Sequence, residues 1–381
     1  MLLGLSLPSF VEPAECIVKI GGTEITDLYP FIISISVEAT RQQHAKATIV
    51  FASPADETDH WLVADDPRLL PDATITIEAD FLTAREEVMR GVVKSVTPNY
   101  PANAGDATVT VTADDDSARF DRAPRLQPWG SGLPSGITDL AILTEIVGGS
   151  GVSLDPFSGT GHSGIFPNQR TTDIVFLTSR ANANGYELLF QEGLLYFGPM
   201  RTAQEAQPPI MVYAGRASNC RTFSAANNGD RPDRYTHRGR NANGDPDRDV
   251  ESVADEPLMG LTPARTSASG LAPQTGRLDR RTSPSEAENA ARARQLAIEG
   301  QFSVRAEGEL DGALYGHVLK VGLPVEVDGV GDAYSGRYYV DKVTHLFDVN
   351  GYKQNFVLLR NALGRAPSAG LGGAISAVMG A

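Results

Sequence analysis

The sequence predicts a mainly β protein with α+β insertions. Runs that alternate between apolar and polar residues, or that are rich in β-branched residues, recur near both ends of the chain and are typical of strands. The 38 glycines and 24 prolines indicate many turns, which suits an all-β architecture. With 381 residues, 41% hydrophobic and 21% charged, the chain is globular and long enough for two or three domains.

Residues 1–125 are predicted to form a first small β-barrel or sandwich, because strand patterns follow one another there without a helix pattern of any length. The strand candidates are CIVKI, FIISISVEA, AKATIVF, ATITIEADF, VMRGVVKSVT and ATVTVTA. Residues 54–66, around Trp61, are acidic and polar and indicate a short helix or loop. Prolines and glycines between positions 124 and 134 indicate a linker that ends this domain.

Residues 126–205 have an α+β pattern. Apolar residues at helical spacing predict helices over 137–147 and 171–185, and each of these patterns runs into glycine. The runs YELLF and LLYFG then indicate a hairpin around Glu192-Gly193.

Residues 206–364 return to strands and carry long polar loops. IMVYAG, NCRTFSAA and RYTHRGR are strand candidates, but most of 226–284 is rich in Asn, Gly, Asp, Arg and Pro and is predicted as loop. A loop of this length is normally a functional or interaction segment. A helix is predicted over 283–300. The strands predicted after it cover 301–308, 317–321 and 324–328.

The clearest local signal is Asn350-Gly351, which lies between two runs rich in Val, Tyr, Phe, Thr and Leu. Asn-Gly favours a two-residue type I′ turn, since both central residues of that turn need positive φ. A turn centred there places Asp348 opposite Lys353. It also places Asp341 opposite Arg360, so that opposite charges face each other at both ends of the ladder.

Four longer segments carry a family resemblance. They are TTDIVFLTSRANANGYELLFQEGLLYFGP, AEGELDGALYGHVLKVGLPVEV, SGRYYVDKVTH and GYKQNFVLLRNALG. In these segments the chain resembles the phage late-control D proteins and the hub portion of VgrG, which are the central hubs of contractile tails and related injection machines. The order of parts in this family fits the whole length of the chain.

The resemblance implies architecture and assembly rather than chemistry. It implies two tube-like small β-barrels in one chain, with a smaller α+β region. It further implies a homotrimer that joins a sixfold tail tube to a threefold spike, with a tail tube protein, a spike protein and baseplate wedge proteins as partners. Such a hub is made in the bacterial cytoplasm and ends in the baseplate of a phage tail or of a phage-derived injection system.

The last segment, 365–381, is predicted to be a flexible tail. In VgrG-like chains the spike domain continues from about this point. The resemblance therefore implies that the spike is a separate polypeptide and that the apolar tail docks onto a neighbour.

Two five-residue segments share the pattern V-x-x-V-T, Val93–Thr97 and Val340–Thr344. Each precedes a loop and an alternating strand. Chance explains a match of five residues by itself, whereas the resemblance to a hub with two related barrels favours an internal repeat.

Composition excludes several classes of function. The net charge of −14 argues against nucleic-acid binding through a basic face, although DNA passing through a lumen of like charge is compatible with it. No apolar run approaches the length of a membrane span, and residues 1–10 lack the basic segment of a signal peptide. Cys16 and Cys220 form neither a zinc site nor a disulfide framework. We interpret both as buried thiols in a reducing compartment; a single long-range disulfide is the alternative.

Two motifs match ligand-binding patterns formally. The first is a G-x-G-x-x-G formed by Gly159, Gly161 and Gly164, but no strand precedes it and Pro167 follows, so a loop is favoured over a dinucleotide site. The second matches four EF-hand ligand positions, but the required glycine and the flanking helices are missing, which favours a solvated acidic loop over a cation site. Its acidic residues are Asp245, Asp247, Asp249 and Glu256.

Catalytic patterns are equally weak. No histidine pair has the spacing of a metalloprotease motif; the six histidines are His44, His60, His162, His237, His317 and His345. Of these, His345 lies in a predicted strand and is expected to be packed or to face an interface. Glu86-Glu87 is a carboxylate pair of the kind that glycosidases use, but neighbouring strand residues point to opposite faces. We therefore expect no catalytic, cofactor-binding or metal-binding residue and no enzymatic activity.

Two other functions compete with the structural hub. A tail-associated cell-wall hydrolase would need a recognisable lytic domain, and the chain has no spare segment for one. A carbohydrate- or receptor-binding tail protein would show exposed aromatic clusters, yet aromatic residues make up only 7% of the chain and fall mostly in predicted strands.

Overall fold

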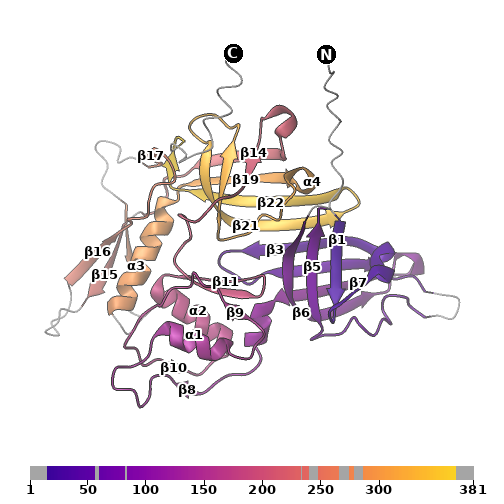
Figure 1. Cartoon of the computed structure of the whole chain (residues 1–381), viewed down its shortest axis with the longest axis horizontal. Coiled ribbons are helices and arrows are strands. Elements are labelled where there is room, and N and C mark those ends of the chain that lie inside the picture. Colours follow the sequence, from indigo (N-terminus) through magenta and orange to yellow (C-terminus); the bar gives the residue numbers. More distant parts are fainter. Residues whose placement is uncertain are drawn as a thin grey trace, which may run out of the picture.

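The computed structural model describes residues 15–55, 60–81, 84–232, 234–239, 248–265, 274–278 and 286–365. A sheet of thirteen strands runs through both ends of the chain and dominates the view in Figure 1. The mainly β fold predicted from the sequence is therefore confirmed. The expectations for residues 1–10 and for the tail after Arg365 lie outside the described residues.

The sheet has two halves, which we name by their strands. The N-terminal half-sheet contains β1 (Glu15–Ile20), β2 (Thr23–Glu24), β3 (Ile32–Thr40), β4 (Lys46–Ala52), β5 (Thr74–Asp80), β6 (Arg85–Asn99) and β7 (Thr108–Asp115). The C-terminal half-sheet contains β13 (Gln207–Met211), β14 (Cys220–Asn227), β19 (Val304–Asp311), β20 (Pro324–Asp328), β21 (Gly336–Asp348) and β22 (Gly351–Arg360). Short 3-10 helices connect some of these strands: η1 (Thr26–Phe31), η2 (Ala104–Asp106), η3 (Asp116–Phe120) and η4 (Gly215–Ala217).

Each half-sheet encloses its own hydrophobic core. In the N-terminal half-sheet, alternate residues of β4 and β5 are buried, and Val37 and Ile49 are fully inaccessible to solvent. The core of the C-terminal half-sheet contains Val340 and Leu358, which are also fully buried. Because side chains alternate between the two faces of a strand, the period-two pattern of the sequence directs one face of each strand into a core.

The two half-sheets have the same strand order. The N-terminal half-sheet runs β3-β4-β7-β6-β5-β1, and the C-terminal half-sheet runs β14-β19-β22-β21-β20-β13. Taken in chain order, the strands of the two halves correspond one to one: β1, β3, β4, β5, β6 and β7 to β13, β14, β19, β20, β21 and β22. One difference is direction, since β1 pairs antiparallel with β5 whereas β13 pairs parallel with β20.

The correspondence extends to β-bulges, where one strand contains an extra residue. The pairing of β6 with β7 shifts between Val93 and Ser95. The pairing of β21 with β22 shifts between Val340 and Lys342. The two V-x-x-V-T segments therefore occupy equivalent positions, and each contains its bulge at the second residue. This result favours an internal repeat over chance.

A second pair of bulges occurs in the ladders β3–β4 and β14–β19. The pairing of β3 with β4 shifts between Ile32 and Ser34. The pairing of β14 with β19 shifts between Cys220 and Thr222. The ladders β3–β4, β4–β7 and β7–β6 therefore have the same register as β14–β19, β19–β22 and β22–β21. Bulges fix such a register, and a slip of one residue would turn each side chain to the wrong face.

The halves are joined along a seam between β3 and β21. The seam is an antiparallel ladder that runs from Lys342 opposite Thr40 to Phe347 opposite Ile35. Two separate cores therefore share one continuous sheet. The domain boundaries at residues 125 and 205 stay predictions.

The terminal hairpin forms, but its predicted register is wrong by two residues. Asp348 lies opposite Gly351, so the turn residues are Val349 and Asn350. Gly351 has a φ of 96°, and the Asp348 carboxylate accepts a hydrogen bond of 2.7 Å from the Asn350 N–H. Asp at the first position of the turn and Gly at the fourth are typical of a type I turn, which competes with the type I′ turn that Asn-Gly favours.

The predicted charge pairs of this hairpin are consequently absent from the ladder. Lys353 lies opposite Leu346, and Asp341 occupies the bulge. Arg360 is fully buried over the ring of Tyr338. Its guanidinium donates to the backbone carbonyls of Ser335, Met259 and Gly364.

The middle of the chain folds as predicted into helices and a small sheet with a third core. Helix α1 (Asp139–Val147) and helix α2 (Asp173–Asn184) match the expected ranges, and α2 ends at Gly185 with a φ of 66°. The hairpin of β11 (Glu187–Gln191) and β12 (Leu194–Gly198) adds β9 (Ser153–Leu154), while β8 (Gln127–Pro128) pairs with β10 (Asn168–Gln169).

The polar region from 226 to 284 contains more strand than predicted. Strands β15 (Arg234–Gly239), β16 (Arg248–Val253) and β18 (Thr275–Leu278) form a small sheet, and helix α3 (Glu286–Gln301) packs on it (Figure 1). Only RYTHRGR was expected as a strand here. The remaining short elements are β17 (Thr262–Pro263), β23 (Ala362–Leu363) and helix α4 (Gly312–Tyr315).

The strand predicted over 317–321 is absent. The backbone N–H groups of three successive residues there donate to side chains instead of to a neighbouring strand. The donors are Val318, Leu319 and Lys320, and the acceptors are Glu86, Gln354 and Gln207. Side-chain acceptors satisfy the backbone and remove the need for a ladder.

Candidate functional site

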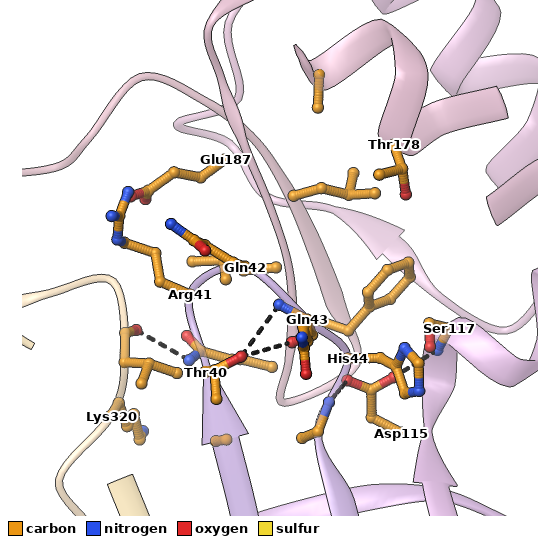
Figure 2. A pocket seen from close by; sticks show the side chains of 18 of the residues that line it. Thr40, Arg41, Gln42, Gln43, His44, Asp115, Ser117, Thr178, Glu187 and Lys320 are labelled. Carbon is orange, nitrogen blue, oxygen red and sulfur yellow. Dashed lines mark hydrogen bonds and ion pairs between the residues drawn. The ribbon is translucent and has the colours of Figure 1, made fainter. Parts of the chain in front are cut away.

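One cavity lies where the three parts of the chain meet. It has a volume of about 520 Å³ and is lined by the β3–β4 turn, α2, β11, α3 and residues 318–321 (Figure 2). Arg41 and His44 come from the N-terminal half-sheet, Glu187 from the middle region, and Lys320 from the C-terminal half-sheet.

Arg41 is the central charge of this cavity, and its side chain is only 5% exposed. Its guanidinium lies 3.1 Å from the Glu187 carboxylate, 3.1 Å from the Asp341 carboxylate and 3.7 Å from Glu299. Burial by itself lowers the pKa of Arg41, but the charges of Glu187 and Asp341 outweigh it and raise that pKa. Arg41 is thus a buried cation with its countercharges supplied by the chain.

Glu187 is equally committed to contacts within the chain. Burial raises the pKa of its carboxyl group, while Arg41 and a hydrogen bond from Tyr339 lower it. The Tyr339 hydroxyl donates to Glu187 at 2.7 Å and accepts from the backbone N–H of Arg201 at 3.1 Å. This network connects all three parts of the chain, so its first role is to hold them together.

Glu87 also lines this cavity. Burial raises the pKa of Glu87 to about 7, and the nearby charge of Arg90 opposes the shift. Lys320 and Glu192, which also line the cavity, pair with each other at 2.6 Å. Figure 2 shows His44 beside Asp115, whose carboxylate accepts from the backbone N–H groups of Ala45 and Ser117 and so fixes the start of η3.

The Glu86-Glu87 pair does not form a shared acid–base site. Glu87 lines the cavity. Glu86 instead accepts from His317 at 2.7 Å and from the backbone N–H of Val318 at 2.7 Å. As expected for strand neighbours, the two carboxylates serve different surroundings.

The histidines are dispersed. His345 is buried and lies 2.9 Å from the Tyr352 hydroxyl, so the expectation that it packs is confirmed. His162 contacts the carbonyl of Ala183 at 3.1 Å. In the described part of the chain, no three His, Cys, Asp or Glu side chains gather in a way that could hold a metal ion.

The two formal ligand motifs have other surroundings. Gly161, with a φ of 65°, lies in a loop against the Asp139 side chain, which accepts from the backbone N–H of His162 at 2.9 Å. Of the EF-hand-like set, Asp245 and Asp247 lie outside the described residues, and Glu256 accepts a hydrogen bond from Thr202.

The two cysteines are unpaired in the structure. Cys16 and Cys220 are free thiols, and both are partly rather than fully buried. Burial raises the pKa of Cys16 to about 12 and that of Cys220 to about 11, which keeps both protonated. Among the described residues, no helix is long and apolar enough to span a membrane.

Two strand edges form a second candidate site. β3 covers the edge of β21 from Lys342 to Phe347. The equivalent edge of β6, residues 95–99, has no strand beside it in the described part of the chain. The outer edge of β14 is likewise without a described neighbour. Sequence reasoning missed both edges, because an open edge is a property of the assembled sheet.

Comparison with known proteins identifies the fold. No protein-family model matches the sequence, and no curated protein sequence matches it. A 43 kDa tail protein of prophage MuSo2 from Shewanella oneidensis superposes with a TM-score of 0.66 at 15% identity, over 91% of this chain and 98% of that one. A tail protein from Neisseria meningitidis gives a TM-score of 0.63 at 13% identity, over 92% and 97%.

A third similar structure comes from a secretion machine. It is the E. coli c3393 protein, a component of the type VI secretion system with structural similarity to the T4 tail proteins gp27 and gp5. Its TM-score is 0.51 at 11% identity, over 92% of this chain and 79% of that one. The chain therefore has the fold of phage tail and type VI secretion proteins, as the resemblance in its sequence implied.

Proposed function

We propose that this protein is the structural central hub of a contractile tail baseplate, a trimeric adaptor between a sixfold tail tube and a threefold spike. The repeated half-sheet is the observation that carries the proposal. Three copies of a chain with two equivalent half-sheets present six similar faces, as a sixfold tube requires. The same three copies present only three of every other element, including α1, α2 and α3, as a threefold spike requires.

The chemistry of the cavity supports a structural role over a hydrolytic one. Arg41, Glu187 and Tyr339 are occupied by one another and connect the parts of the chain. We infer that the chain has no enzymatic activity. A turbidity assay on peptidoglycan tests this inference, and clearing by the purified chain would contradict it.

The assembly is tested by imaging and by mass. Mass photometry of the purified chain is expected to show a trimer, and electron micrographs should show a threefold ring with six similar subdomains around a central channel. The ring should bind the tail tube protein on one face and a separate spike protein on the other, with baseplate wedge proteins at its rim. A ring of six copies would contradict the proposal.

A further inference from the structure

We infer that β14 of one copy pairs antiparallel with residues 95–99 of β6 in the next copy, in the register of the internal seam. The inference rests on the proposed trimer and names the joint that closes it. It follows from the two open edges and from the equivalence of the half-sheets.

Because the two half-sheets are equivalent, the pairing in the internal seam predicts the pairing in the joint. In the seam, β3 pairs with the part of β21 that follows the bulge. β14 is the counterpart of β3, and residues 95–99 are the counterpart of that part of β21. Within one chain these two counterparts lie well apart (Figure 1), so only a second copy can bring them together. Three copies would then alternate three internal seams with three such joints.

The matched bulges fix the expected register. Lys342 corresponds to Ser95, and Glu38 corresponds to Ala226, through the ladders that both half-sheets share. The seam pairs Thr344 with Glu38. The joint should therefore place Thr97 opposite Ala226, with its other pairs following from this one.

The composition of the two edges supports pairing. Residues 95–105 contain no charged side chain, and neither do residues 222–229, although charged residues make up 21% of the chain. Both stretches are largely exposed to solvent. Natural proteins usually protect open edges with charges, especially lysine, or with proline; the β14 edge has neither and the β6 edge has only Pro98, which supports a covering strand in the assembly.

Pro98 limits the strength of this joint. Pro98 corresponds to His345. In the seam, the Arg41 N–H donates to the Asp341 carbonyl, so the backbone groups of Asp341 point toward β3. Because this direction alternates along a strand, the backbone groups of His345 also point toward β3. Pro98 has no N–H to donate at this place. The joint thus has fewer ladder hydrogen bonds than the seam, as suits a contact that forms on assembly.

Disulfide trapping tests the joint. In the double variant Thr97→Cys with Ala226→Cys, made in a Cys16→Ala, Cys220→Ala background, the two cysteines fall at a pair without mutual hydrogen bonds. Cα atoms of such a pair are about 4.5 Å apart, which lies within the range that a disulfide bridges. Both positions are exposed, so the substitutions leave the cores intact.

Oxidation of this variant is expected to give a covalent trimer on a non-reducing gel. A mixture of the two single variants should give a covalent dimer only. Thr97→Cys with Ser224→Cys is the matched control, because it places the cysteines about 7–8 Å apart on a diagonal and should cross-link several-fold less. Thermal unfolding checks that each variant is folded.

The possible results of this experiment test the strand joint and the proposed hub separately. Preferential cross-linking of 97 to 226 supports both. A trimer by mass photometry that cross-links the control pair equally well, or neither pair, overturns the joint and leaves the proposed hub standing. A chain that stays monomeric at all concentrations, with no cross-link, overturns the joint and the proposed trimer together.

Discussion

The two half-sheets share their strand order and bulge positions but have different surroundings. At the shared bulge, Asp341 faces the buried guanidinium of Arg41, whereas Lys94 is 65% exposed and pairs with Asp114 at 2.7 Å. Four positions along the same strands, His345 is buried and Pro98 is exposed. The two half-sheets thus share their register, but their side chains differ according to whether a neighbouring strand covers the edge.

Removing the buried cation beside the C-terminal bulge should have the largest effect. Arg41→Met leaves the fully buried Glu187 without its countercharge, and we expect a loss of about 3–5 kcal/mol in the free energy of unfolding. Urea denaturation at neutral pH measures it. The double variant Arg41→Met with Glu187→Gln is the control, because it removes the stranded charge and should recover part of the loss; no recovery would assign the effect to packing.

Acid sensitivity should distinguish His345 from its counterpart. Burial lowers the pKa of His345 to about 3 from 6.5, so the folded chain cannot take the proton that the unfolded chain takes below pH 6.5. Stability is therefore lost as the pH falls from 6.5 toward 3, by on the order of 3–5 kcal/mol. His345→Gln should remove this component from unfolding curves measured across that range.

The matched control introduces a histidine at the equivalent open position. Pro98→His in the unassembled chain should leave the acid sensitivity between pH 6.5 and 3 unchanged, since no strand covers that edge. An increase comparable with the His345 contribution would show that the two edges do not differ as described.

Glu87, on the N-terminal half-sheet, should give a pH slope of the opposite sign. Its pKa is raised from 4.5 to about 7, so the folded chain holds a proton that the unfolded chain has released between these values. Stability thus falls as the pH rises through that window. Glu87→Gln should be more stable than the unmodified chain above pH 7, by on the order of 1–3 kcal/mol, and equal to it below pH 4.5. A gain that persists at pH 4 would point to another cause.

The smallest effect belongs to the exposed bulge. In Lys94→Met the lost lysine is 65% exposed, although its partner Asp114 is largely buried, and we expect a loss of about 1 kcal/mol. Measured beside Arg41→Met under the same conditions, this variant should shift the urea midpoint only slightly. A loss as large as that of Arg41→Met would remove the contrast between the two bulges.

The sequence predicted what depends on neighbouring residues. The alternating strands and helices α1 and α2 follow from short-range patterns, whereas the V-x-x-V-T match by itself was consistent with chance. The hairpin register failed because Asp348 begins a different turn from the one that Asn350-Gly351 favours. The network of the cavity left no local signal, since Arg41 contacts groups 146 and 300 residues away.

The seam between β3 and β21 also determines the order of events during synthesis. Arg41 and Asp341 are 300 residues apart, so β3 emerges from the ribosome long before its partner. At about 5–20 residues per second the wait is roughly 15–60 s. During that time the backbone of β3 is an open edge on which Glu38 is the single charged side chain. Nascent chains that stall before residue 342 would expose this edge to one another, and polysomes translating the message would be the place where misassembly begins.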